Sequence, residues 1–419
     1  MHFIYNQLIC FVSFIFARLA PHLKPSTKLR RFICMQKGLI QEIEKVMASV
    51  NDERPVIWFH AASYGEYNIA RPIVRHLHAS GRWRIMLTFF SPTGLDMYHT
   101  YKEEVDAVFM LPLDTVAQAH SFLDAVKPQK AVFLVSEYWA SYLLELRRRQ
   151  IPAYLISANI TRKALPVRWF GGLWRKAMQA FEQIFVLNEA SRQRLMHVGI
   201  HRVSVVGDPL FDNVLSRAAK EYHNTIIEHF AAQSDVFIAG SIHNDKDLQL
   251  VTKLANHHPD IRFLIVPHEI CEEILFNIMR RLKGAARLYS ECNEQTDFGS
   301  TQTLIIDFMG ALTYLYRYAR WAYVGGGFTP YLHSVIEATA YGLPVAFGPR
   351  VERKLVAKEL IAEGIGRSVR FWMELNQWFC DLKSDNARMD VIASRARMYM
   401  QAHQGSTETI IKTISAYER

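Results

Sequence analysis

The chain has 419 residues, of which 50% are hydrophobic and 12% are aromatic, and its formal net charge is +9. This length predicts two or three domains, and this composition excludes long disordered stretches. A basic chain favours polyanionic partners, and because the sequence has no zinc finger, RNP-like motif or long Lys/Arg run, acidic lipids and phosphorylated substrates are favoured over nucleic acid.

The amino terminus is apolar. Residues 3–17 are almost all hydrophobic, and a positive cluster from Arg18 to Arg31 follows. The run is shorter than the ~20 residues of a spanning helix, and no signal-peptide cleavage site follows it. We therefore predict that residues 1–22 anchor the chain to the cytoplasmic face of a membrane, either in the interface or marginally spanning. The alternative is an amphipathic helix docked on the protein.

Short apolar runs alternate with helical stretches from residue 55 onwards. A helix is expected from about Glu66 to Ala79. Buried strands that alternate with helices favour a parallel sheet covered on both faces. The strands predicted in this series are Val56–Phe59, Arg84–Phe90, Ala107–Leu111, Ala131–Val135, Ala153–Ser157 and Gln183–Leu187.

A second series of the same kind follows a polar helical stretch at 213–234, and the last ~50 residues look mostly helical. Two such series predict an α/β chain with two Rossmann-like domains facing each other across a cleft. The strands predicted here are Val236–Ala239, Arg262–Val266, Thr303–Ile306, Trp321–Val324 and Val345–Phe347. The expected divisions are an anchor at 1–22, an N-terminal domain at 23–212, a C-terminal domain at 213–390 and C-terminal helices at 391–419.

Ligands bind beyond the carboxyl ends of the strands in open α/β sheets, and this rule selects two acidic loops. The segment His60-Ala-Ala-Ser-Tyr-Gly-Glu66 follows the first strand, and Glu66 opens a helix, where its charge suits the helix dipole. Glu66 is either a catalytic carboxylate or a structural one. The segment Ser136-Glu-Tyr-Trp139 leaves the same choice for Glu137, a site acid or another helix start.

Two glycine-containing segments follow strands of the second series. Gly325-Gly-Gly327 leads to His333-Ser-Val-Ile-Glu337 at the expected head of a helix, a combination that predicts a phosphate cradle but also occurs as a plain turn. Gly342-Leu-Pro-Val-Ala-Phe-Gly-Pro349 reads as turn, buried strand and turn. It is interpreted as scaffold, with only its Gly348-Pro349 end near a ligand.

The five cysteines, Cys10, Cys34, Cys271, Cys292 and Cys380, are odd in number and form no C-x-x-C pair. This pattern is typical of a reducing compartment and indicates neither a disulfide framework nor a zinc site. Since no cluster of metal ligands is evident elsewhere in the sequence, we expect neither a metal nor a cofactor.

Taken together, these segments resemble the Kdo transferase family of lipid A biosynthesis. The resemblance covers about residues 29–370, and the order and spacing of many pieces make it specific. The pieces are Trp58-Phe-His-Ala-Ala-Ser-Tyr-Gly-Glu66, Ser91-Pro-Thr-Gly94, Ser136-Glu-Tyr-Trp139, Ser157-Ala-Asn159, Gly207-Asp208, Phe211-Asp212, Ala239-Gly-Ser241, Val266-Pro-His268, Met309-Gly310 and Gly325 through Pro349.

This resemblance implies a GT-B fold and an inverting, metal-independent transfer of 3-deoxy-D-manno-octulosonic acid (Kdo) from CMP-Kdo to a lipid A precursor at the inner membrane, with no nucleic acid involved. By position, Glu66 matches the catalytic base and Glu137 a second acid that assists the transition state. The residues expected to bind substrate are Ser63, Gly65, Ser241, Pro267, His268, Met309, Gly310, Gly326, His333, Ser334, Glu337 and Lys354.

Several positions depart from the family pattern. Leu210 stands where a basic residue is usual, Ala311 where an acid is common and Ser334 where asparagine is frequent, and His268-Glu269 replaces an Arg-His pair. Two other functions therefore stay open. One is another transferase or an epimerase of similar architecture that uses a UDP-sugar. The other is a catalytically impaired relative, which Leu210 and Ala311 favour.

Overall fold

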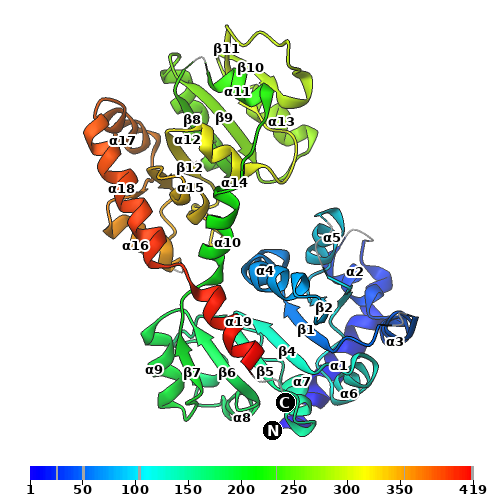
Figure 1. Cartoon of the computed structure of the whole chain (residues 1–419). Coiled ribbons are helices and arrows are strands. Elements are labelled where there is room, and N and C mark those ends of the chain that lie inside the picture. The colour runs from blue at the N-terminus through cyan, green and yellow to red at the C-terminus, as the bar shows by residue number, and fades with distance from the viewer. Residues whose placement is uncertain (25–26, 50–51, 102–104, 233, 353, 417–419) are drawn as a thin grey trace. The chain divides into compact units, whose positions relative to one another are not determined.

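The structure is a computed structural model, and it describes residues 1–24, 27–49, 52–101, 105–232, 234–352 and 354–416. The chain divides into two compact units, which we call unit 1 (Met1–Asn213 and Gln404–Arg419) and unit 2 (Val214–His403) (Figure 1). The division after Asn213 lies one residue from the boundary expected from the sequence. The segment predicted at 391–419 is shared between the units, and its residues 417–419 lie outside the described ranges. The cleft expected between the domains stays a prediction.

Unit 1 is built on a parallel sheet of seven strands in the order β3-β2-β1-β4-β5-β6-β7. Its central strands are continuous runs of buried residues, because helices cover both faces of a parallel sheet. The strands are β1 (Val56–Ala61), β2 (Arg84–Phe89), β3 (Ala107–Met110), β4 (Lys130–Leu134), β5 (Ala153–Ala158), β6 (Phe181–Val186) and β7 (Val203–Val205). The helices are α1 (His2–Leu19), α2 (Lys28–Met35), α3 (Leu39–Ser49), α4 (Tyr64–Ala79), α5 (Pro92–Tyr101), α6 (Val116–Val126), α7 (Ala140–Arg148), α8 (Gly172–Met178), α9 (Glu189–His197), α19 (Ser406–Ala416), and the short η1 (Ala20–His22) and η2 (Leu165–Val167).

Unit 2 repeats this design with a parallel sheet in the order β10-β11-β9-β8-β12-β13-β14. The strands are β8 (Val236–Ile242), β9 (Arg262–Pro267), β10 (Ala285–Leu288), β11 (Thr301–Ile305), β12 (Trp321–Val324), β13 (Val345–Phe347) and β14 (Gly366–Ser368). The helices are α10 (Pro209–Ala218), which leads in from unit 1, α11 (Thr225–Ala231), α12 (Asp245–His257), α13 (Glu272–Met279), α14 (Leu312–Leu315), α15 (Ile336–Ala340), α16 (Leu355–Ala362), α17 (Trp372–Lys383), α18 (Asn386–Ala402), and the short η3 (Tyr289–Glu291) and η4 (Tyr316–Tyr318).

Each strand predicted from the sequence is present, and the α/β class is confirmed. The strands that the sequence analysis missed are β7, β10 and β14. Each of them lies at an edge of its sheet, has only three or four residues and is partly exposed. A short edge strand has no run of buried apolar residues, so the pattern that reveals central strands is absent from it.

The last helix of the chain, α19, returns to unit 1, where it packs against α4 (Figure 1). Asp212 holds this return, because its carboxylate oxygens accept hydrogen bonds from the backbone N–H groups of Gly405 and Thr407, both at 2.7 Å. The buried ammonium of Lys130 donates to the carbonyl of Ile414 near the end of the helix. The end of the chain is therefore part of the N-terminal unit.

Helix α1 lies on unit 1 through polar contacts. The Tyr5 hydroxyl donates to the buried Asp114 carboxylate at 2.7 Å, and the Val116 backbone N–H donates to the Asn6 side chain at 2.8 Å. The segment His2–His22 is long and apolar enough to cross a membrane by length and composition, and only 6% of it is buried. The helix thus has a docked polar face and a large apolar surface that unit 1 does not cover.

Candidate functional site

Glu66 lies in the first turn of α4, which follows β1 at the carboxyl edge of the first sheet. Ser63 is the N-cap of α4, and its hydroxyl accepts a hydrogen bond from the Glu66 backbone N–H at 3.3 Å. The Glu66 carboxylate turns back and accepts a hydrogen bond from the Ala62 backbone N–H at 2.8 Å. These bonds satisfy N–H groups at the start of the helix, so Glu66 has the structural role that the sequence left open.

The same carboxyl is suited to proton transfer. Burial in the turn raises the pKa of Glu66, the negative charge of Glu137 raises it further, and the hydrogen bond from Ala62 opposes both effects, leaving a pKa of about 7. A general base is most effective when its pKa lies near the working pH. The structural and catalytic roles of Glu66 are therefore compatible.

Glu137 lies in the loop after β4, the strand that neighbours β1 in the sheet. It does not start a helix, since α7 begins at Ala140 with Trp139 as its N-cap. The Trp139 indole N–H donates to the Glu137 carboxylate at 2.5 Å. Two residues earlier, Val135 has a φ of 57°, which is rare for a β-branched residue. Such local strain is typical of loops whose conformation serves a site.

A chain of buried hydrogen bonds leads from Glu137 into the sheet. His60 and Thr88 are register partners in β1 and β2, and His60 Nδ1 lies 2.9 Å from the Thr88 hydroxyl. That hydroxyl accepts from the Trp58 indole N–H at 2.8 Å. On its other side, His60 Nε2 lies 3.2 Å from Glu137 Oε2 and 3.0 Å from the Trp139 indole nitrogen. His60 and Trp139 together hold the Glu137 carboxylate in place.

Sequence reasoning missed the roles of His60 and Thr88. Both residues lie inside strands that were recognised only as buried. Their signal was present as polar side chains at 0% exposure within otherwise apolar runs, and buried polar groups need partners.

Three histidines meet at the carboxyl edge of the second sheet. His243 follows β8, His268 follows β9, and His333 lies beyond β12, and these three strands are neighbours. Each ring contributes a nitrogen, and these nitrogens all lie within 4.8 Å of one another. The sequence analysis named His268 and His333 but missed His243 and the cluster, because the three residues are far apart in the chain.

Two of these imidazoles, those of His268 and His333, have pKa values below the ordinary value of histidine. Burial lowers the pKa of His333, and proximity to His268, His243 and Lys354 lowers it further, to about 3. Burial also lowers the pKa of His268, with a further contribution from His243 and opposition from Glu269. Neutral imidazoles have lone pairs available to a ligand.

Asp247 fixes the loops that present this cluster. Its fully buried carboxylate accepts hydrogen bonds from the Tyr323 hydroxyl at 2.6 Å, the Gly326 backbone N–H at 2.7 Å and the Asn244 side chain at 2.7 Å. The loop after β8 is thereby joined to the glycine loop after β12. Burial raises the pKa of Asp247, while the bonds that it accepts oppose this rise.

The glycine triplet is explained by close backbone packing. A Cβ on Gly325 would lie 2.1 Å from the Ser241 carbonyl oxygen, and one on Gly327 would lie 2.5 Å from the Gly348 nitrogen. Gly326 has a φ of +88°, which other residues rarely adopt. The helix expected to begin at His333 begins instead at Ile336 and has five residues. The phosphate cradle proposed for this segment stays a prediction, and the His333 backbone N–H donates to the Gly325 carbonyl.

The other predicted site residues divide between the units. Ser63 and Gly65 flank Glu66 in unit 1. In unit 2, Glu337 is half-buried on α15, and its Oε1 accepts from the Thr313 hydroxyl at 2.9 Å; burial raises its pKa, and Thr313 and Arg217 oppose the rise. The remaining predicted residues lie at or near the carboxyl edge or in loops of unit 2, and they are Ser241, Pro267, Met309, Gly310, Ser334 and Lys354.

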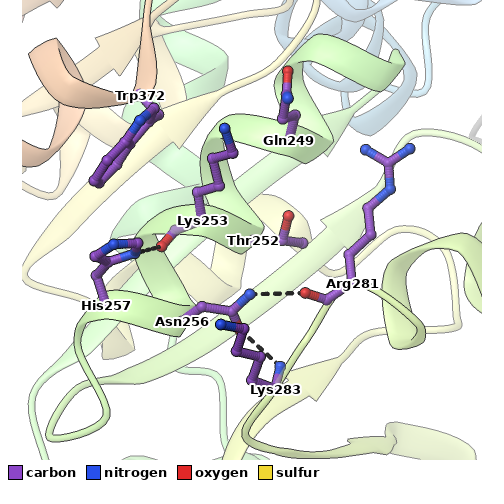
Figure 2. Close-up of a pocket in the computed structure, with 8 residues that line it drawn as sticks. All are labelled: Gln249, Thr252, Lys253, Asn256, His257, Arg281, Lys283 and Trp372. Carbon is purple, nitrogen blue, oxygen red and sulfur yellow. Dashed lines mark hydrogen bonds between the residues drawn. The ribbon is translucent and has the colours of Figure 1, made fainter.

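A hollow of about 460 Å³ in unit 2 is lined by the second half of α12, by Arg281 and Lys283, and by Trp372 of α17. Figure 2 shows the side chains that line it. Asn256 holds its floor, donating to the Arg281 carbonyl at 2.8 Å and accepting from the Lys283 N–H at 2.7 Å. Since α12 runs back from the carboxyl end of β8, this hollow lies towards the amino edge of the sheet, away from the histidines.

A family model described as 3-Deoxy-D-manno-octulosonic-acid transferase (kdotransferase) matches residues 33–213. The 3-deoxy-D-manno-octulosonic acid transferase of Chlamydia trachomatis serovar A is 26% identical over 75% of this chain and 74% of its own length. The Aquifex aeolicus enzyme of that name is 25% identical over 78% and 86%, and the Bordetella pertussis enzyme 24% over 86% of each.

Solved structures with a similar fold cover most of the chain. A putative UDP-N-acetylglucosamine 2-epimerase from Listeria monocytogenes has a TM-score of 0.62 at 13% identity, covering 87% of this chain and 96% of that one. MurG of Acinetobacter baumannii has a TM-score of 0.54 at 12% identity, covering 87% and 99%. At such low identity these likenesses concern the fold alone, and they agree with a GT-B-like architecture.

Replacing Asp247 with asparagine should destabilise unit 2. The amide of the variant keeps one acceptor oxygen, but its two N–H donors would face groups that donate to the carboxylate in the wild type. An unsatisfied buried polar group costs ~1–3 kcal/mol. We expect a lower thermal melting temperature for Asp247→Asn. The matched control is Asp245→Asn, two residues earlier at the start of α12, where the carboxylate is 76% exposed and pairs with Arg281. Equal melting temperatures for the two variants would contradict the role given to Asp247.

Proposed function

We infer that this chain, which belongs to the 3-deoxy-D-manno-octulosonic acid (Kdo) transferase family and is therefore a glycosyltransferase, transfers Kdo from CMP-Kdo to a lipid A precursor with inversion at the anomeric carbon. The observation that carries this proposal is the Glu66–Glu137 pair. It lies within the matched residues 33–213 and gives Glu66 a pKa of about 7.

In the proposed reaction, a sugar hydroxyl of the acceptor attacks the anomeric carbon of Kdo. The new C–O bond forms as the bond to the CMP phosphate breaks, and the phosphate leaves with the bonding electrons. Glu66 accepts the hydroxyl proton, a contribution of ~10²–10⁴-fold for a positioned base. Direct displacement from the face opposite the leaving group inverts the configuration.

Glu137 has two roles in this proposal. Its negative charge raises the pKa of Glu66 and so makes Glu66 a stronger base. As a carboxylate held by His60 and Trp139, it also stabilises the positive charge that develops at the anomeric carbon, because a charge fixed in advance costs no reorganisation during the reaction. His60, Thr88 and Trp58 act as positioning residues.

Unit 2 is proposed to bind the donor. His268 and His333 at the carboxyl edge contact the CMP phosphate, and the exposed ammonium of Lys354 supplies positive charge near His333. Glu337 is proposed to accept a ribose hydroxyl beside the bond that it already accepts from Thr313. The remaining donor contacts are assigned to Ser241, Pro267, Met309, Gly310, Gly326 and Ser334.

We also propose that α1 lies along the cytoplasmic surface of the inner membrane. Its Tyr5 and Asn6 side chains hold one face on unit 1, so the helix is not free to cross a bilayer. On its other faces Phe3, Phe11 and Phe14 are 56–72% exposed. A helix with one docked polar face and a large apolar face suits the headgroup boundary.

A loop beside α1 extends this surface. Trp169 is 88% exposed and Phe170 40% exposed, with the Arg168 guanidinium over the Phe170 ring at 5.4 Å. The loop adjoins α1, because Trp174 packs edge-on against Tyr5 at a ring-centre distance of 6.0 Å. Exposed tryptophan beside cations favours a membrane interface with acidic lipids. The acceptor's acyl chains would lie in that membrane.

Purified protein given CMP-Kdo and a tetraacylated lipid A precursor should yield a Kdo-bearing product by mass spectrometry. We expect Glu66→Gln to lower the turnover number by ~10²-fold or more, because the amide cannot accept the proton, while CMP affinity measured by calorimetry changes little.

The matched control is Glu189→Gln, which alters an exposed glutamate at the start of another helix, α9, where it pairs with Arg192. Turnover of Glu66→Gln equal to that of Glu189→Gln would refute the assignment of the base. Transfer from a UDP-sugar in place of CMP-Kdo would refute the proposed donor.

The double variant Trp169→Ala/Phe170→Ala should bind vesicles of phosphatidylglycerol and phosphatidylcholine ~10-fold or more weakly in a sedimentation assay. Burying one large apolar side chain is worth ~1.5–3 kcal/mol, and ~1.4 kcal/mol corresponds to a factor of ten. Phe276→Ala, which removes a 67% exposed aromatic from unit 2, should leave binding unchanged. If both proteins bind as tightly as the wild type, the loop is not a membrane contact.

A further inference from the structure

The hollow in unit 2 that Figure 2 shows is lined by cations and by an aromatic ring. Lys253, Arg281 and Lys283 contribute basic side chains, and Trp372 contributes its indole. Among the described residues that line the hollow, none is acidic. Its volume of about 460 Å³ lies within the range of small-molecule pockets, roughly 300–1,000 Å³. The hollow is therefore large enough to hold a small anionic ligand.

Two of the three cations in the hollow have no acidic partner. Arg281 pairs with Asp245, whose carboxylate is 76% exposed, so solvent screens this pair. Lys253 and Lys283 form no ion pair with any described residue, and the Lys253 ammonium lies over the Trp372 ring, 6.0 Å from its centre. Cations of one sign around a concave surface attract an anion.

The walls of the hollow are held in place by the fold. Asn256 on α12 bonds to the backbone of Arg281 at 2.8 Å and of Lys283 at 2.7 Å, and it thereby fixes the turn that follows α13. His257 packs against Trp372 with a ring-centre distance of 4.4 Å. A site formed in advance loses less conformational freedom when it binds a ligand.

We propose that this hollow binds the phosphate group of a ligand that also has an apolar body. Lys253 and the turn that carries Arg281 and Lys283 hold the phosphate, because ammonium and guanidinium groups donate charge-assisted hydrogen bonds to phosphate oxygens. Two kinds of molecule present such a group, a soluble phosphate ester and the headgroup of an acidic lipid.

Trp372 is the contact for the apolar body. It lies at the start of α17, and in Figure 2 its ring and the Arg281 guanidinium lie on opposite sides of the Lys253 side chain. Its chain neighbours Phe371 and Met373 are 61% and 63% exposed, so the apolar surface continues beyond the hollow. An exposed aromatic and apolar surface beside cations suits a ligand that is apolar at one end and anionic at the other.

The hollow is separate from the residues that the proposed function assigns to the donor. Those residues lie at or near the carboxyl edge of the second sheet, whereas α12 runs back from that edge towards the hollow. The inference therefore does not rest on the proposed function, and it is tested without any sugar donor.

The full-length protein is titrated by calorimetry at low ionic strength with 1-naphthyl phosphate, with 1-naphthol and with inorganic phosphate. We expect one 1-naphthyl phosphate to bind per chain, ~10-fold or more tightly than either of the other two, because it alone makes both the charged and the apolar contacts. Added salt should weaken its binding, since the charges around the hollow are accessible to solvent.

The double variant Lys253→Gln/Lys283→Gln should bind 1-naphthyl phosphate at least ~10-fold more weakly, because two charge-assisted hydrogen bonds are lost. The matched control is Lys220→Gln/Lys358→Gln, which removes two exposed lysines elsewhere in unit 2 and should bind like the wild type. None of these four lysines is buried, so both variants should fold normally, and far-ultraviolet circular dichroism checks this.

Sedimentation with vesicles of phosphatidic acid and phosphatidylcholine distinguishes the two sources of the phosphate. If the source is a lipid, Lys253→Gln/Lys283→Gln should bind these vesicles ~10-fold more weakly than the control variant. If the source is a soluble ester, both variants should bind them equally, since α1 and the loop at 168–170 are unchanged.

The proposal is overturned if the wild type does not bind 1-naphthyl phosphate, or if Lys253→Gln/Lys283→Gln binds it as tightly as Lys220→Gln/Lys358→Gln does. Equal affinities of the wild type for 1-naphthyl phosphate and inorganic phosphate would overturn the contact assigned to Trp372.

Discussion

The Glu66 carboxyl lies in a half-buried turn beside the negative charge of Glu137, and both circumstances disfavour its ionised form. Burial and the charge of Glu137 together raise the pKa of Glu66 to about 7, and this makes a helix-start glutamate suitable for proton transfer in unit 1. It depends on the parallel sheet, which places the carboxyl ends of β1 and β4 side by side. It also depends on His60, whose hydrogen bond to Glu137 extends through Thr88 to Trp58 inside the sheet.

In unit 2 the site residues also lie at the carboxyl edge of the parallel sheet, but they are histidines instead of glutamates. The carboxyl ends of β9, β8 and β12 bring three histidines together, and burial and mutual proximity lower the pKa values of His268 and His333. Asp247 has the same role in unit 2 as His60 has in unit 1. Each is a buried polar residue that fixes the loops of its site. In each unit the residues that contact a ligand therefore depend on a buried partner inside the fold.

Much of this could be predicted from the sequence. Central strands such as β1 and β8 are continuous apolar runs, and Glu66 and Glu137 follow such runs within segments that resemble a known family. The edge strands β7, β10 and β14 could not be recognised, because they are short and partly exposed. His243 and Asp247 were missed for another reason: their importance arises from contacts with residues far along the chain, and a linear pattern does not record them. The start of α15 was misplaced because a backbone bond from His333 to Gly325 overrides the local pattern.

The central claim is that burial and the negative charge of Glu137 together give Glu66 a pKa near neutrality, and the pH dependence of kcat/KM for Kdo transfer tests it most directly. Protonated Glu66 cannot accept the acceptor's proton, so activity should fall as the pH drops through about 7 in the wild-type enzyme. In Glu137→Gln the repulsion is gone, the pKa of Glu66 should fall, and this acidic limb should move to lower pH. An acidic limb near 4.5, the ordinary pKa of a glutamate, in the wild type, or the same limb in both proteins, would contradict the account.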